Sequence, residues 1–257
     1  MKEQKRGKVY FIGAGPGDPD LITVKGRKRI QEADLVLYAG SLVPVEVVAC
    51  AKEGAKVVDS SSMTLDQTHS AIMKTVGSGG MVARVHTGDP SLYGAVREQA
   101  RLLERDGVDY EIIPGVSVAF ATAARAAISF TLPENTQTLI LTRTGGKTPV
   151  PEREQLSDLA SHGCSLAIYL SAWNTGGMVQ QLLSGGYPGD TPVVVGYRVG
   201  WPDEEIFHTT LWDLVRDVKK RGIRRQAVFL VLPGQGRNAR SHLYDPAFTH
   251  GFRKGTE

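Results

Sequence analysis

The sequence has only two cysteines, Cys50 and Cys164, among its 257 residues. They lie far apart and form no CxxC pair, which argues against a disulfide framework and against a cysteine-ligated zinc site. The sequence also has no apolar run long enough for a membrane-spanning helix or for the core of a signal peptide. We therefore expect a soluble cytoplasmic protein in a reducing compartment, with no membrane partner.

Several sequence patterns of catalysis are missing as well. The six histidines show no HxH or HxxxH spacing, so no protein-bound metal is predicted. There is no GxSxG elbow, which argues against a serine hydrolase, and no P-loop, which argues against ATP chemistry. The formal net charge is only +3, so the sequence predicts no nucleic-acid partner.

Short apolar β-rich runs alternate with helical stretches through the first half of the chain. This alternation predicts parallel strands in a layered α/β fold. The composition, 41% hydrophobic and 22% charged, is typical of a soluble globular protein. The predicted strands are 9–12, 35–38, 56–58, 81–85 and 110–113, and the predicted helices are 21–33, 65–76, 95–105 and 117–127.

The alternation restarts after a break at residues 131–135. We therefore predict two domains, an N-terminal α/β domain over 1–132 that carries glycine-rich loops and a C-terminal α/β domain over 133–257. The predicted strands of the second domain are 138–142, 165–170, 193–197, 206–209 and 227–232, and its predicted helices are 154–160, 178–183 and 211–220.

A glycine-rich loop, GAGPGDPD at 13–20, follows the first predicted strand. It is not the GxGxxG pattern of dinucleotide-binding proteins, because Gly17 comes one position early and Asp18 stands where the last glycine belongs. Pro16 also removes a backbone donor from the place where a pyrophosphate would need one. The loop permits close approach to its backbone, and a plain tight turn is the alternative.

Two more glycine-bearing junctions follow later strands, HTGDPSLYG at 86–94 and PGVS at 114–117. Ligands of open α/β sheets bind beyond the carboxyl ends of the strands, where all three loops would lie. Asp89 could bind an ammonium group or ribose hydroxyls, or it could be only the first residue of an Asp-Pro turn. We interpret His86 as a strand-end histidine rather than a catalyst, and Ser117 as the cap of the next helix.

The three loops resemble the N-terminal markers of the tetrapyrrole methylase family, whose members use S-adenosylmethionine to methylate corrin and sirohaem precursors. IYLS at 168–171, YRVGWPDE at 197–204 and TTLWDL at 209–214 extend the resemblance over nearly the whole chain. YAGSLVP at 38–44, QTLILTR at 137–143 and TPVPERE at 148–154 are similar to the branch that methylates C11 of precorrin-4. The tail LYDPAFTHGFRKG is similar to the cobalt-pathway members of that branch.

The resemblance implies two α/β domains of unlike topology with the active cleft between them, in a homodimer that binds a corrinoid tetrapyrrole. It also implies which positions contact S-adenosylmethionine. Relatives often have methionine at position 170 and alanine at position 199, so this chain departs from the pattern at both. The implied contacts are Pro16, Thr87, Gly88, Asp89, Leu92, Tyr93, Ser117, Val118, Leu170, Val199 and Thr210.

Methyl transfer from a sulfonium releases a neutral leaving group, so it depends on orientation and water exclusion more than on acid-base groups. We therefore assign no catalytic base. Arg84, Arg97, Arg143 and Arg198 are candidates for binding the ring carboxylates. Three alternatives are another precorrin methyltransferase, a non-catalytic S-adenosyl or tetrapyrrole binding protein, and a nicotinamide oxidoreductase, against which Asp18 argues.

Overall fold

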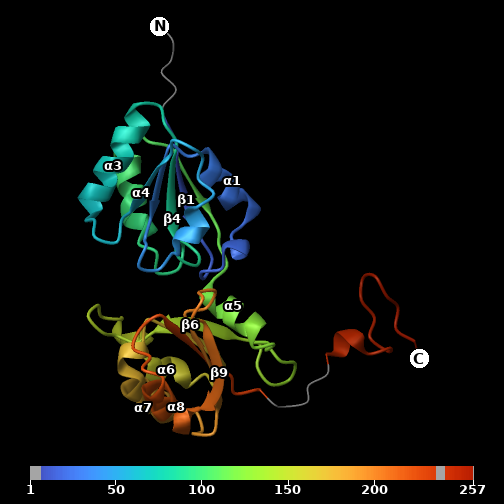
Figure 1. Ribbon diagram of the computed structural model, residues 1–257. Coiled ribbons are helices and arrows are strands. Elements are labelled where there is room, and N and C mark those ends of the chain that lie inside the picture. Colours follow the sequence, from blue (N-terminus) through green and yellow to red (C-terminus); the bar gives the residue numbers. More distant parts are fainter. Residues whose placement is uncertain (1–6, 236–240, 257) are drawn as a thin grey trace. The chain divides into compact units, whose positions relative to one another are not determined.

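The computed structural model describes residues 7–235 and 241–256, and it confirms the α/β fold class (Figure 1). Its contacts divide the chain into two compact units. The first unit runs to Ala121 and also includes Arg198–Glu205, and the second comprises Thr122–Tyr197 and the chain from Ile206 onward. The contact boundary therefore falls earlier than the domain boundary predicted near residue 133, and a later segment joins the first unit.

The sheet of the first unit has five strands in the order β3-β2-β4-β1-β5, and every pair in it is parallel. Of its three inner strands, β1 and β4 are buried along their whole length. Strands buried on both faces need nearly continuous apolar sequence, and VYFIG of β1 provides it. The strands are β1 (Val9–Gly13), β2 (Leu35–Tyr38), β3 (Lys56–Asp59), β4 (Val82–His86) and β5 (Tyr110–Ile113).

Helices cover both faces of this sheet (Figure 1). Tyr10 and Ile12 belong to one core cluster, together with residues of α1 (Val24–Glu32) and α2 (Val45–Val48). Val9 and Phe11 belong to the opposite cluster, together with residues of α3 (Leu65–Gly77) and α4 (Val96–Arg105). Because β1 leads to α1 and its neighbour β4 leads to α4, their connections leave toward opposite faces. Open α/β sheets bind their ligands at such a point, beyond the carboxyl ends of the two neighbouring strands.

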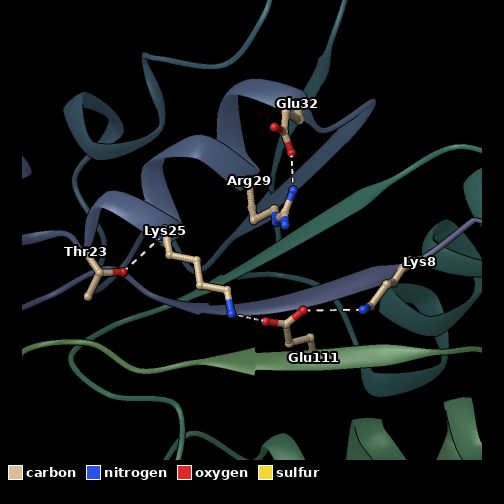
Figure 2. A network of polar contacts seen from close by, with 7 residues as sticks. Lys8, Thr23, Lys25, Arg29, Glu32 and Glu111 are labelled. Carbon is tan, nitrogen blue, oxygen red and sulfur yellow. Dashed lines mark hydrogen bonds and ion pairs between the residues drawn. The ribbon is translucent and has the colours of Figure 1, made fainter.

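A network of charged side chains fixes the start of α1 (Figure 2). The carboxylate of Glu111, on β5, pairs with Lys25 in the first turn of α1 and with Lys8, 3.3 Å away. These cations, Lys25 above all, lower the pKa of Glu111. Thr23 caps the helix by accepting a 3.0 Å hydrogen bond from the backbone N–H of Gly26. The helix that follows the first glycine-rich loop is thus tied to the edge of the sheet.

The second unit contains a mixed sheet in the order β6-β7-β10-β8-β9. β6 and β7 are parallel, but β10 is antiparallel to both β7 and β8, so this sheet is mixed where the first is parallel. The two topologies are unlike, as the resemblance implies. The strands are β6 (Leu139–Arg143), β7 (Ser165–Tyr169), β8 (Pro192–Tyr197), β9 (Glu205–Thr210) and β10 (Ala227–Val231).

Three helices cover the core face of this mixed sheet, where Leu166, Ile168, Phe229 and Val231 are fully buried. They are α6 (Leu156–Ala160), α7 (Thr175–Ser184) and α8 (Leu211–Lys220). Along the chain, α5 (Val118–Arg125) follows β5 and precedes β6. Single 3-10 turns occupy Pro19–Leu21, Glu152–Glu154, Ala172–Asn174 and His242–Tyr244. No helix within 7–235 or 241–256 has the length and apolar character needed to cross a membrane.

Candidate functional site

The three glycine-bearing loops of the first unit meet backbone to backbone. A Cβ atom on Gly13 would lie 2.5 Å from Cα of Gly115 and 2.7 Å from the carbonyl oxygen of Gly88. Gly88 donates a 2.8 Å hydrogen bond to the carbonyl of Gly15 and accepts one of 3.3 Å in return. Only residues without side chains allow this packing, so the glycines join the three loops into one closely packed cradle of backbone rather than three separate turns.

Asp89 joins two of these loops. One carboxylate oxygen accepts a 2.8 Å hydrogen bond from the backbone N–H of Ser91, and the other accepts a 2.9 Å bond from the N–H of Gly115. The first bond belongs to the Asp-Pro turn, and the second reaches the loop after β5. Asp89 is therefore both a turn residue and a bridge between two loops. It would also act on a ligand indirectly, because it helps to fix the position of the glycine cradle.

The loop after β4 holds side chains in a strained conformation. Tyr93 has φ 56° and Ala95 has φ 49°, both in the left-handed region that bulky residues avoid. Tyr93 is nevertheless 45% exposed. Strained residues of this kind persist where the surrounding structure imposes them, and they cluster at ligand sites. The predicted contacts Leu92 and Tyr93 lie in this turn, and Thr87 lies at its start.

The first loop packs against a segment from the second half of the chain. A Cβ atom on Gly17 would lie 2.6 Å from the indole ring of Trp201, within Arg198–Glu205. The guanidinium of Arg198 lies 4.2 Å from the centre of that ring and donates a 2.6 Å hydrogen bond to Asp203. Sequence reasoning missed Trp201. The off-pattern Gly17 was the available signal, because such a glycine indicates that another group approaches closely.

The same segment brings Val199 to the first unit, together with Pro16 of the first loop. Val199 as a whole residue is only 2% exposed, and its contact with a ligand stays a prediction. Asp18 is occupied as a cap, since its carboxylate accepts a 2.9 Å hydrogen bond from the N–H of Asp20. It therefore holds the turn into α1 and would face a dinucleotide phosphate with a negative charge.

Ser117 and Val118 lie where α5 begins. Ser117 is 8% exposed, and its carbonyl accepts a 3.1 Å hydrogen bond from Ala121, as expected of the residue that precedes a helix. Its Cα lies 3.9 Å from where a Cβ atom of Gly88 would be. The structure thus brings nine of the predicted contacts into the first unit: Pro16, Thr87, Gly88, Asp89, Leu92, Tyr93, Ser117, Val118 and Val199.

The other two predicted contacts, Leu170 and Thr210, lie in the second unit. Leu170 follows β7 with φ 52° and is 60% exposed, and the fully buried hydroxyl of Ser171 beside it donates to the carbonyl of Tyr169. Thr210 precedes α8, and its buried Oγ1 has no hydrogen-bond partner among the described residues. A buried hydroxyl without a partner is costly, so a ligand or water would be expected to satisfy it. Both residues have the features of a ligand contact, and that role stays a prediction.

The four candidate arginines all have partners within the protein. Arg84 is only 9% exposed, so it has little surface to offer to a ring carboxylate. Arg97 pairs with Glu104 at 2.9 Å, and Arg198 pairs with Asp203. Arg143 donates to the carbonyls of Thr148 and Pro149 at 3.0 and 2.7 Å, which closes the loop after β6 on itself.

His86 is buried at the end of β4, with its ring centre 5.8 Å from that of Phe11. Burial, and secondly the charge of Arg84, lower the pKa of His86 to about 3, so the ring is neutral at physiological pH. Its Nε2 has no hydrogen-bond partner among the described residues. His86 cannot exchange a proton readily near neutrality. In the described part of the chain, no three His, Cys, Asp or Glu side chains gather as metal ligands would.

Residues 8–215 match the family model described as tetrapyrrole (corrin/porphyrin) methylases. The chain belongs to this family. A protein of Priestia megaterium named cobalt-precorrin-4 C(11)-methyltransferase is 51% identical over 257 residues, which cover 97% of this chain and 99% of that protein. The family resemblance of the three loops is thereby confirmed.

Solved structures of the family share the fold. A cobalt precorrin-4 methyltransferase is 50% identical and superposes with a TM-score of 0.87 over 90% of this chain and 97% of the other. A uroporphyrin-III C-methyl transferase of Thermus thermophilus, complexed with S-adenosylhomocysteine, is 25% identical, with a TM-score of 0.71 over 88% of this chain and 97% of the other.

Proposed function

We propose that this protein is an S-adenosylmethionine-dependent C-methyltransferase of cobalamin biosynthesis that methylates C11 of cobalt-precorrin-4 or of precorrin-4. The observation that carries the proposal is the 51% identity, over nearly the full length of both chains, to a relative named for that reaction. The intact glycine cradle favours an enzyme over a non-catalytic binding protein.

The described residues fit an S-adenosyl ligand. The cradle of Gly13, Gly88 and Gly115 packs three loops backbone to backbone, and Asp89 holds two of these loops together. The hydroxyl of Thr210, in the second unit, is buried without a partner among the described residues and is a candidate for a ligand contact of its own. The related Thermus enzyme, with S-adenosylhomocysteine in its complex, supports this ligand class.

S-adenosylmethionine supplies a methyl group on a sulfonium whose departure leaves a neutral thioether. The chain therefore needs to orient the donor and exclude water, rather than to donate a proton to the leaving group. The strained and exposed side chain of Tyr93 suits apolar contact with the donor. The neutral His86 fits a site without strong acid-base chemistry, and we assign no general base.

We expect no affinity for a nicotinamide dinucleotide. Pro16 lacks the backbone N–H that a pyrophosphate would need, and Asp18 places a carboxylate beside that position. Calorimetry with NAD and with S-adenosylhomocysteine separates the two ligand classes. Tighter binding of NAD would favour the oxidoreductase alternative.

The cobalt-bearing ring is the preferred substrate in this proposal. The name of the Priestia relative and the similar tail support that preference, and the cobalt would arrive inside the ring as part of the substrate. Differences of ring shape change the free energy of binding by about 1–3 kcal/mol, so the metal-free ring is expected to react more slowly rather than not at all.

The deciding experiment offers each ring with isotopically labelled S-adenosylmethionine and locates the new methyl group by NMR. Methylation of C11 is expected for both rings, faster for the cobalt form. A methyl group at another carbon would identify a different precorrin methyltransferase, and binding of both ligands without transfer would identify a binding protein. Turnover of the metal-free ring alone would overturn the cobalt preference.

A further inference from the structure

Arg84 is a buried cation without a counter-ion in the described part of the chain. It lies on β4, the residue is 9% exposed, and no carboxylate within 7–235 or 241–256 pairs with it. Burial lowers the pKa of its guanidinium to about 10. Burying a charge that has only neutral partners is unfavourable, and an apolar side chain of similar size is often no worse for stability. A function other than folding would account for an arginine here.

The hydrogen bonds of Arg84 lead to two different sets of loops. Its Nε donates a 3.0 Å bond to Oε1 of Gln99 on α4, which in turn donates through Nε2 to the carbonyl of Ala95 at 3.3 Å. Ala95 is one of the strained residues of the loop after β4, residues 87–95, which we call the donor loop. Gln99 is 7% exposed, so the relay runs through the interior.

On its other side Arg84 reaches the ends of β2 and β3. Its Nη1 donates to Oγ of Ser60 at 2.8 Å and to the carbonyl of Leu37 at 3.4 Å. The Ser60 hydroxyl then donates to the carbonyl of Tyr38 at 3.0 Å. The segments that follow Tyr38 and Asp59, residues 39–44 and 60–63, are called here the edge loops.

The edge loops are themselves joined. One carboxylate oxygen of Asp59 accepts hydrogen bonds from the N–H groups of Gly40 and Ser61, at 2.9 and 2.8 Å. These two donors hold the pKa of Asp59 below its usual value. A shift of Ser60 would therefore move both edge loops, since Ser60 lies between Asp59 and Ser61. The edge loops and the donor loop all follow carboxyl ends of one parallel sheet, where ligands of such sheets bind.

We propose that Arg84 is a positioning residue that couples the donor loop to the edge loops, so that the binding of the methyl donor and the geometry of the edge loops depend on each other. The inference rests on the proposed function only in taking an S-adenosyl compound as the ligand of the donor loop. The guanidinium of Arg84 suits this role, because one planar group of N–H donors holds Gln99 and Ser60 in fixed directions. A lysine could bond to only one of them well.

The test is a mutant cycle read by calorimetry with S-adenosylhomocysteine. Ser60→Ala removes the contact on the edge-loop side, and Ser62→Ala is the control, because Ser62 is exposed on the same loop and makes no hydrogen bond to Arg84. Ser60→Ala is expected to raise the Kd about threefold to tenfold. Ser62→Ala is expected to leave it unchanged. Thermal unfolding of every variant checks that the fold is retained.

The cycle is closed in the Arg84→Met background, where Ser60→Ala is expected to have no further effect on the Kd. If Ser60 acted only through its own local surroundings, Ser60→Ala would weaken binding by the same factor in the wild type and in Arg84→Met. If Arg84→Met fails to fold, Gln99→Leu serves as the background, because it removes the hydrogen bonds that connect Arg84 to the donor loop.

Equal Kd values for Ser60→Ala and Ser62→Ala would overturn the coupling, and so would an effect of Ser60→Ala that persists when the relay is cut. If the wild-type protein fails to bind S-adenosylhomocysteine, the proposed function fails first and the coupling falls with it. Binding by the wild type together with an unaffected Ser60→Ala would overturn only the coupling.

Discussion

Two buried polar residues, Arg84 and His86, point to the same face of β4. Alternate residues of a strand share a face, and the ring of Phe11 and the amide of Gln99 lie on that same side. The apolar pattern of the sequence indicated that this strand is buried. It did not indicate that Arg84 forms hydrogen bonds to Gln99 and Ser60 in the interior. The partners come from α4 and from the end of β3, which are distant in sequence.

His86 should make the protein less stable in mild acid. Its pKa is about 3 in the folded state and near 6.5 in the unfolded state, so between these values only the unfolded state takes up the proton. Stability then falls as the pH drops below 6.5, by up to about 1.4 kcal/mol for each pH unit. Urea unfolding at pH 6.5 and pH 5 measures this loss.

His86→Gln is expected to remove most of that pH dependence, because it removes the proton uptake. The control is His162→Gln, since His162 is exposed and its loss should leave the slope as in the wild type. Equal slopes for wild type and His86→Gln would show that His86 titrates normally in the folded protein.

Asp89→Ala is expected to weaken S-adenosylhomocysteine binding more than it weakens folding. The substitution removes a carboxylate that could bind an ammonium group or ribose hydroxyls of the ligand, and losing one hydrogen bond to a charged group costs about 1.5–3 kcal/mol. That corresponds to a Kd higher by roughly tenfold to a hundredfold. Calorimetry and urea unfolding measure the two effects, with the exposed Asp109→Ala as the control. An unchanged Kd would reduce Asp89 to a turn residue.

At the scale of elements, the hydrophobic pattern located most helices and strands. β2, β5 and α8 begin and end where the sequence predicts, and Thr64 caps α3 in a capping box with Gln67. α2 was missed, because four residues are too few to show a helical period. α1 begins later than predicted, because Pro19–Leu21 form a separate 3-10 turn capped by Asp18.

The meeting of three loops makes a glycine substitution informative. Gly13→Ala is expected to abolish detectable binding of S-adenosylhomocysteine and to lower the unfolding free energy by about 1–3 kcal/mol, because its Cβ would overlap backbone atoms that cannot rotate away. Gly77→Ala, at the end of α3, is the matched control, since a Cβ there would meet no atom within 4 Å. We expect it to bind normally and to be at least as stable. A Gly13→Ala protein that binds like the wild type would contradict a packed cradle.

At the scale of the whole molecule, we expect two copies of the chain to associate. This prediction comes from the family resemblance alone. Sedimentation equilibrium at micromolar concentration should give twice the chain mass of 27.8 kDa. A mass equal to that of one chain would contradict it, and a dilution series would distinguish a weak dimer from a monomer.

The sequence by itself determined the family, the α/β class and the three glycine-bearing loops of the candidate site. These features are local, because a glycine forced by close backbone packing and a strand buried on both faces leave their mark within a few residues. Leu92, Tyr93 and Ser117 could be placed for the same reason, since they belong to the same short motifs.

Only the tertiary structure decided which distant groups meet. It brought Trp201 against Gly17, buried Arg84 between Gln99 and Ser60, and set β10 antiparallel between β7 and β8. Each of these contacts joins segments far apart along the chain. No periodicity or spacing encodes them, because they depend on the order in which strands enter a sheet and on which loops then share its edge.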